Sequence, residues 1–80
     1  AEDRLDKAET SLEKAVDLLR GVGDDYGLAC AQLSLAELYD GQDQTRPRND
    51  LLAECKPTFD RLGATIEIAR AEALIAASAV

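Results

Sequence analysis

The chain has 80 residues and a formal net charge of −7, with 16 acidic residues, 9 basic residues and no histidine. A chain of this length forms one domain with a thin core, and its acidity argues against nucleic acid as a partner, because neutralising phosphates requires a basic face. Alanine and leucine dominate the apolar residues and favour helix. The predicted fold class is therefore all-α, in a single domain over residues 1–80.

The first helix is predicted over residues 2–20. Its apolar residues recur at steps of three and four and form one stripe: Leu5, Ala8, Leu12, Ala15, Leu19 and Val22. Gly21 and Gly23 are expected to end this helix, since glycine adopts the left-handed C-terminal conformation without a Cβ clash.

The second helix is predicted to begin at a cap formed by Asp24 or Asp25 and to run to about Asp40, before Gly41. Its apolar residues occupy most of its circumference: Leu28, Ala29, Cys30, Ala31, Leu33, Leu35, Ala36, Leu38 and Tyr39. A helix with this pattern is covered by protein on more than one side.

The third helix is predicted to begin between Thr45 and Asp50 and to reach Leu62. Pro47 fits a first helical turn, where its missing N–H costs nothing. Pro57 removes a hydrogen bond to the carbonyl of residue 53, so a kink or a break is expected there.

The fourth helix is predicted from about Ala64 to the end of the chain. Its last segment, residues 71–80, carries Glu72 as its one charged residue and is too short to span a bilayer. An apolar helix must be covered by protein, so we expect self-association through Leu74, Ile75 and Val80, most simply by a two-fold contact between identical faces. The alternative is a closed monomeric bundle in which this helix folds back across the core.

The charge and the cysteines bear on partners and compartment. Residues 1–45 carry 11 acids against 4 bases, whereas residues 46–80 carry 5 of each; an acidic half is usually a solvated face and less often selects a basic partner. Cys30 and Cys55 lie in apolar helical patterns and, without histidine, cannot complete a zinc site. Buried, reduced thiols and a cytoplasmic location are therefore expected. No run of apolar residues is long enough to cross a membrane. The chain contains no methionine, so we expect it to be a segment of a longer protein, the alternative being a processed chain.

The two halves of the sequence align without a gap when residue 41 is placed on residue 1. Apolar residues fall on apolar residues, and one glycine falls on another, so a helix, a stop and a second helix recur. We call positions paired in this way equivalent. They include Leu12 with Leu52, Ala15 with Cys55, Leu19 with Phe59, Val22 with Leu62, Gly23 with Gly63, Tyr26 with Ile66, Ala29 with Ala69, and Leu35 with Ile75. A fixed period of this length indicates stacked helical hairpins.

Within that period the chain resembles the tetratricopeptide repeat. Leu35, Ala36 and Tyr39 stand at the spacing of the repeat's first helix, and Ala8, Leu12 and Ala15 at that of its second. The departures are Gln32, Arg48, Pro57 and Asp60, and a period longer than the usual one. The longer period is similar to that of repeats in bacterial signalling ATPases and maltose-regulator-type transcription activators. An unrelated four-helix bundle is the alternative fold.

The resemblance implies a concave groove lined by the second and fourth helices, along which a protein or peptide partner lies. Transferred by spacing, the groove residues are Cys30, Leu33, Ser34, Glu37, Asp40, Arg70, Ala73, Leu74 and Ala77. In the branch of the family that grips C-terminal carboxylates, lysine and asparagine occupy these faces. Leu33 and Glu37 stand there instead. Binding of a C-terminal carboxylate is therefore not expected, and a basic or apolar partner is expected.

No pattern of residues predicts catalysis or a cofactor. Gly21–Gly23 lacks the third glycine of a phosphate-binding loop, and the serines have no histidine to activate them. Glu9, Glu13 and Asp17 share one helix face but are expected to be solvated. Two functions are therefore predicted: a protein-binding module, or a structural segment that stacks on further repeats or on itself. The expected core residues are Leu12, Leu35, Leu52 and Phe59.

Overall fold

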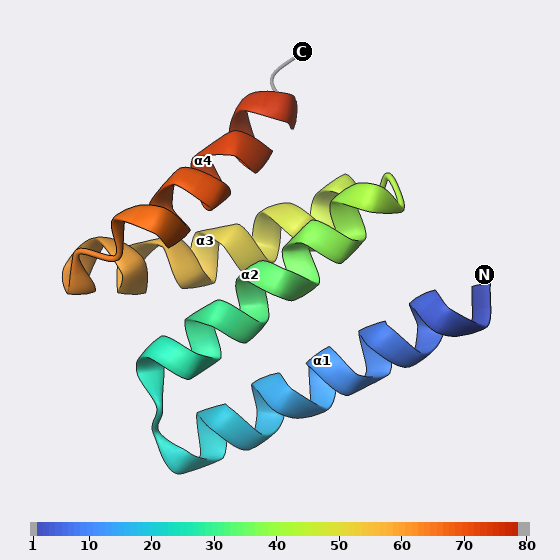
Figure 1. Ribbon diagram of the computed structural model, residues 1–80, viewed down its shortest axis with the longest axis horizontal. Helices are drawn as coiled ribbons and strands as arrows, with labels where there is room; N and C mark the ends of the chain where they lie inside the picture. The colour runs from blue at the N-terminus through green and yellow to red at the C-terminus, as the bar shows by residue number, and fades with distance from the viewer. Residues whose placement is uncertain (1, 79–80) are drawn as a thin grey trace.

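The computed structural model describes the backbone of residues 2–78 and the side chains of residues 6–76. The described residues form the helices α1 (Glu2–Val22), α2 (Asp25–Gly41), α3 (Thr45–Leu62) and α4 (Thr65–Ser78). Consecutive helices run antiparallel (Figure 1). The predicted all-α fold of helical hairpins is confirmed for this part of the chain.

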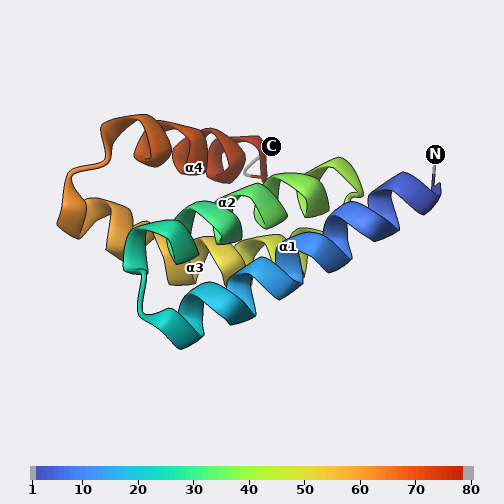
Figure 2. The ribbon, with the colours of Figure 1, turned by 60° about the horizontal axis from the view of Figure 1, so that its bottom comes forward.

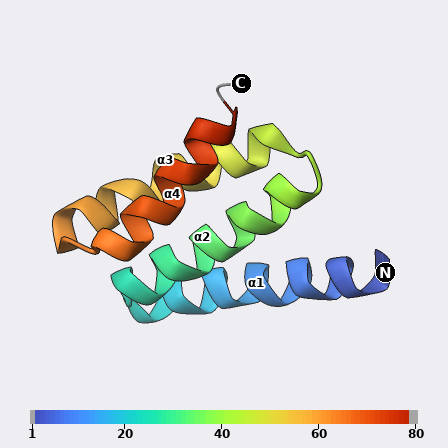
Figure 3. The same ribbon diagram turned by 45° about the horizontal axis from the view of Figure 1, so that its top comes forward.

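The helices are arranged in an ordered row. The most extensive contact joins α2 and α3, while α1 packs on α2, α4 packs on α3, and α4 also touches α2. Figure 2 shows α1 and α4 on opposite sides of the molecule, and Figure 3 shows α2 between α1 and the α3–α4 pair. The expectation that α2 is covered on more than one side is confirmed, because it contacts the other three helices.

The turns at Gly23 and Gly63 lie at equivalent positions of the two halves, as predicted. Both glycines adopt a positive φ, 75° and 68°. After each, the next amide donates to a carbonyl in the last turn of the preceding helix, Asp24 N to Leu19 O at 3.2 Å and Ala64 N to Phe59 O at 3.0 Å. These bonds satisfy carbonyls that the end of a helix leaves unpaired. Because of them α1 and α3 end, and α2 and α4 begin, at equivalent positions.

Two predictions about the helices need correction. The first helix includes Gly21 and ends at Val22 rather than Arg20. Of the kink or break expected at Pro57, the break does not occur, since α3 continues through Pro57 to Leu62. Ala53 and Pro57 are both exposed, so the carbonyl that loses its hydrogen-bond donor lies on the outer side of α3. The predicted first-turn position of Pro47 and the cap at Asp24 agree with the structure, since the Asp24 carboxylate accepts from Gly27 N at 2.9 Å.

The core lies where α2, α3 and α4 meet. Its fully or nearly fully buried members are Ala29, Leu33, Ala36, Leu52, Cys55, Phe59 and Ala71. Leu35 is also buried, so three of the predicted core residues, Leu35, Leu52 and Phe59, are confirmed. Leu12 is only half-buried. The prediction for Leu12 fails because α1 has a helix on one side only, and Val16 is the buried residue of that contact.

Candidate interaction surfaces

The predicted groove residues form a surface between α2 and α4 that is closed by an ion pair. Arg70 of α4 donates from Nε to Oε2 of Glu37 at 3.1 Å, and a second bond joins Nη2 to Oε1. This pairing raises the pKa of Arg70 above its ordinary value. Cys30, Ser34 and Leu74 are half-buried beside the pair. The two charges therefore bind each other, and a ligand on this surface would have to displace or bridge them.

Two of the predicted groove residues are turned toward α3 instead, Leu33 fully buried and Asp40 half-buried. Leu33 is fully buried in the core and cannot contact a partner. Asp40 binds Arg48 of α3, with 2.5 Å between Oδ1 and Nη1. Both corrections have one cause, because the side of α2 that carries them is covered by α3. Ala73 is exposed as expected, and Ala77 lies outside the described side chains.

The three residues predicted for self-association do not form one surface in the described structure. Leu74 packs against the core, and Ile75 is 40% exposed. Val80 lies outside the described residues. Leu74 and Ile75 thus lie toward α2 and α3 rather than on the outermost side of α4.

Arg48 is a buried cation that the sequence alone did not identify as structural. It is 4% exposed, and its Nε and Nη2 each donate to Oδ1 of Asn49 at 3.2 Å while Nη1 binds Asp40. Removing a buried guanidinium from water is costly unless its donors are paired. In this position the pairing closes the α2–α3 turn.

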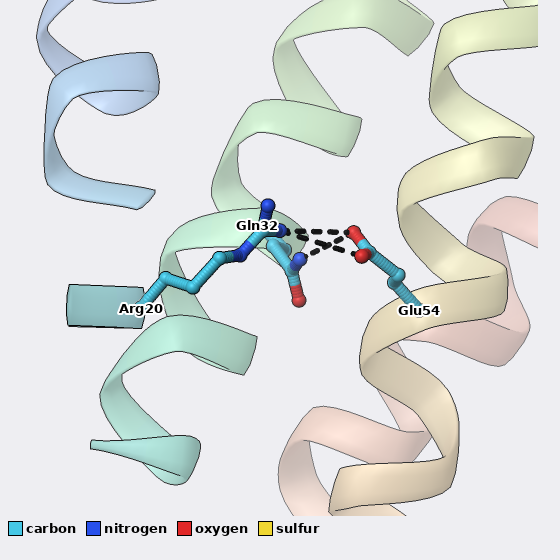
Figure 4. Close-up of polar contacts among 3 residues, drawn as sticks. All are labelled: Arg20, Gln32 and Glu54. Atoms are coloured by element: carbon cyan, nitrogen blue, oxygen red, sulfur yellow. Dashed lines mark hydrogen bonds and ion pairs between the residues drawn. The ribbon is translucent and has the colours of Figure 1, made fainter. Parts of the chain in front are cut away.

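A polar network joins three helices, α1, α2 and α3. Figure 4 shows Arg20 of α1 and Gln32 of α2 pointing toward Glu54 of α3. Gln32 Nε2 donates to Glu54 Oε2 at 2.6 Å, and Arg20 Nη2 lies 3.3 Å from Glu54 Oε1. Gln32 is buried and takes up one oxygen of the carboxylate. The group therefore satisfies its own members and links α1 to α3.

Tyr26 joins the start of α2 to α4. Its hydroxyl donates to Glu67 Oε1 at 2.6 Å, and its ring lies edge-on to Phe59, with 6.3 Å between the ring centroids. The hydrogen bond with Glu67 raises the pKa of Tyr26 and lowers the pKa of Glu67. No periodicity in the sequence indicated this pair, because its members come from different halves of the chain.

Both cysteines are free thiols. Cys55 is fully buried, and burial raises the pKa of its thiol to about 11. A thiol with this pKa is protonated at neutral pH and is a poor nucleophile. Cys55 fits a role as a small core residue.

The acidic side chains of α1 show no arrangement that suggests a catalytic pair. Glu13 and Asp17 are exposed, Glu9 is half-buried, and none of them forms an ion pair with another described residue. Tyr39 lies near them, and burial, followed by the charges of Glu9 and Glu13, raises its pKa. Within the described residues, no group of His, Cys, Asp or Glu is placed to hold a metal ion.

A hollow of about 460 Å³ lies between the outer side of α3 and α4. It is lined by Asn49, Leu52, Ala53, Lys56, Pro57, Asp60 and Ile75. Lys56 Nζ lies 3.9 Å from Asp60 Oδ2 on its rim. The two charges of this hollow partly neutralise each other, so it offers a ligand no net charge.

The outermost side of α4 is apolar and uncovered. Ile66 is 73% exposed, and Ala69, Ala73 and Ala76 are exposed at helical spacing behind it. We call these four residues the α4 outer face. Their equivalents in the first half of the chain are Tyr26, Ala29, Leu33 and Ala36, of which the last three are buried against α3 in the core. The α4 outer face therefore repeats the α3-binding face of α2.

In the part of the chain that the structure describes, no helix combines the length and the apolar character that crossing a bilayer requires. No protein-family model, no curated protein and no solved structure matches this chain.

Proposed function

We propose that this chain is a non-catalytic protein–protein interaction module, built from tetratricopeptide-like helical hairpins, that binds other helical segments through its outer helices. The observation that carries the proposal is the α4 outer face. In α2 three of the four equivalent residues, Ala29, Leu33 and Ala36, are buried in the core, and in α4 an apolar surface of the same register is exposed. An apolar stripe at helical spacing is a surface for helix packing.

The environment of the remaining polar groups supports binding rather than chemistry. The Glu37–Arg70 pair, the Asp40–Arg48 pair and the Gln32–Glu54 hydrogen bond satisfy one another within the chain. Free thiols that pack as apolar side chains fit a reducing compartment, so we place the protein in the cytoplasm. The partner that suits the α4 outer face is an amphipathic helix whose apolar stripe resembles that of α3.

A chain extended by one helix tests whether the α4 outer face is a docking surface. Residues 41–62, which contain the α2–α3 turn and α3, are copied and joined directly after Val80, so that the copy continues the repeat in register. If the copied helix packs on α4 as α3 packs on α2, the free energy of unfolding rises by about 1–3 kcal/mol, because Ile66 and its neighbours become buried. Urea denaturation followed by circular dichroism measures this change.

The matched control carries Cys55→Asp and Phe59→Asp in the copied helix only, which removes its apolar stripe and keeps its length. Tyr26 lies edge-on to Phe59 in the existing pair, so nuclear Overhauser contacts should join the Ile66 methyl groups to the copied Phe59 ring. Equal stability of the extended chain and its control, with no such contacts, would show that α4 does not dock a helix through this face.

A further inference from the structure

The outer side of α1 also carries an uncovered apolar stripe. Leu18 and Val22 are 72% and 71% exposed, and Ala8 and Ser11 are exposed at steps of three and four along the same side. We call these four residues the α1 outer face. Large apolar side chains this exposed, aligned on one helix, mark a surface that contacts protein. Ala15, in the same row, is half-buried.

The α1 outer face corresponds to the side of α3 that packs on α2. The equivalent residues in the second half are Arg48, Leu51, Thr58 and Leu62, and Cys55 is equivalent to Ala15. Arg48 and Cys55 are buried, and Leu51 packs against the core. The four residues of the α1 outer face are exposed because α1 packs along α2 alone and reaches α3 only through the Arg20–Glu54 pair.

The two outer faces are thus the two halves of one interface. The α4 outer face repeats what α2 presents to α3, and the α1 outer face repeats what α3 presents to α2. The helices that carry them, α1 and α4, lie on opposite sides of the molecule (Figures 1 and 2) and are not in contact. Within one copy the two faces cannot meet, whereas two copies can bring them together.

The charges beside the two faces are also complementary. In the α2–α3 pair, Gln32 donates a hydrogen bond to Glu54 at 2.6 Å. The residues equivalent to these are Glu72 on α4 and Lys14 on α1. At the positions where α2 and α3 carry a hydrogen-bonded polar pair, α4 and α1 therefore carry an acid and a base. Neither Glu72 nor Lys14 has an ion-pair partner among the described residues.

We propose that copies of this chain associate head to tail, with the α1 outer face of one copy seated on the α4 outer face of the next as α3 sits on α2. The inference rests on the proposed function and names the partner as a second copy. Because the contact joins two different faces, it is heterologous and propagates into open chains of copies. It differs from the expected two-fold contact between identical α4 faces. A single helix pair is a small interface, so the association is weak.

Complementation between two blocked variants tests the head-to-tail contact. Ala73→Glu blocks the α4 outer face, and Leu18→Glu blocks the α1 outer face; both positions are exposed, so both variants should keep the wild-type circular dichroism spectrum and unfolding curve. Sedimentation velocity at up to about 1 mM is expected to show that the mass of the wild-type chain grows with concentration. Each variant alone should stay monomeric. An equimolar mixture should form one species of twice the monomer mass, because each variant supplies the face that the other lacks.

Other outcomes overturn the inference. If Leu18→Glu still associates while Ala73→Glu does not, and the mixture forms no complex, α4 pairs with α4. If the wild-type chain stays monomeric at the highest concentration, self-association is refuted; the proposed function survives that result if the extended chain described above docks its added helix. Ala53→Glu, at an exposed position of α3 outside both faces, is the matched control and should associate as the wild-type chain does.

A charge exchange gives a second readout that does not depend on blocking either face. Glu72→Lys or Lys14→Glu alone should weaken association by about two- to fivefold, the range for an exposed ion pair. The double variant Glu72→Lys with Lys14→Glu should restore it. A double variant weaker than either single variant would show that these two residues do not meet between copies.

Discussion

The central helix pair and the outer helices carry the same residue pattern in different surroundings. In α2, Ala29, Leu33 and Ala36 are buried, while Ala69, Ala73 and Ala76 occupy the same register of α4 and are exposed. The pattern thus specifies which face of a helix is apolar, and the neighbouring helix decides whether that face is buried. Among the described residues, the outer faces of α1 and α4 are therefore exposed, whereas α2 and α3 pack against each other.

The sharpest test of this difference compares one leucine from each region. Leu33→Ala removes a fully buried side chain of the core and should lower the free energy of unfolding by about 2–5 kcal/mol. Leu18→Ala removes a side chain that is 72% exposed and should change it by less than about 0.5 kcal/mol. Urea denaturation at a concentration where the chain is monomeric measures both. Similar values for the two would mean that α1 buries its outer side within the monomer.

The ion pairs allow the same comparison for charges. Asp40→Asn leaves the buried Arg48 guanidinium without its carboxylate and should cost about 1–3 kcal/mol of stability. Glu37→Gln removes the carboxylate that binds Arg70. The Glu37 and Arg70 side chains are 38% and 43% exposed, so this substitution should lower the free energy of unfolding by less than about 1 kcal/mol. Urea unfolding midpoints of the two variants, measured at low and at high salt, give the loss of stability for each. A larger loss for Glu37→Gln would place the stabilising pair on the α2–α4 surface.

Glycine substitutions compare the space around α1 with that around α2. A Cβ at Gly21 of α1 meets no atom within 4 Å, so Gly21→Ala should stabilise the chain by about 0.5–1 kcal/mol through reduced backbone entropy. A Cβ at Gly27 of α2 would lie 2.6 Å from Oδ2 of Asp24. Gly27→Ala must therefore displace the helix cap and should stabilise less than Gly21→Ala. Thermal unfolding monitors both variants, and a greater gain at Gly27 would contradict the cap geometry.

The smallest expected effect concerns pH and the link between α2 and α4. The pKa of Glu67 is lowered by the Tyr26 hydroxyl, so the stabilisation from this bond is complete above the carboxyl's ordinary pKa and is lost as the pH falls through the lowered one. Tyr26→Phe should return the pKa of Glu67 toward its ordinary value and reduce the loss of stability in acid. Carbon-detected NMR titration of Glu67 checks this, and an identical titration curve in the variant would mean that the bond does not form.

Local signals account for the parts of the fold that were predicted correctly. Asp24 caps α2, Gly63 ends α3 and Pro47 falls in the first turn of α3, and each acts through the backbone of its own turn. Leu52 and Phe59 were expected in the core because they continue an apolar stripe, and α3 has helices on two sides. Such features depend on residues only a few positions away and are visible in the sequence.

The features that were missed depend on neighbours distant in sequence. Leu12 and Val16 both suit the α1–α2 contact, and only the position of α2 decides that Val16 is the one buried. In the sequence Arg48 is a departure from the tetratricopeptide pattern, and only its ion pair with Asp40 in the structure explains why a cation is buried there. Ala73 and Leu74 were expected on the same accessible side of α4, and the structure divides them, since Ala73 is exposed whereas Leu74 packs against the core. The alignment of the two halves distinguishes Ala73 from Leu74, because Ala73 is equivalent to Leu33, which is buried in α2.

The row-like arrangement of the helices has a consequence for local opening. Val16 is the one α1 side chain among those described that is buried, and α1 packs on a single neighbour. Separating α1 from α2 exposes Val16 and breaks the Arg20–Glu54 pair, but it leaves the core between α2, α3 and α4 intact. The amides of α1 should exchange with deuterated solvent through partial openings of low free energy, and those of α2 and α3 only when the whole domain unfolds.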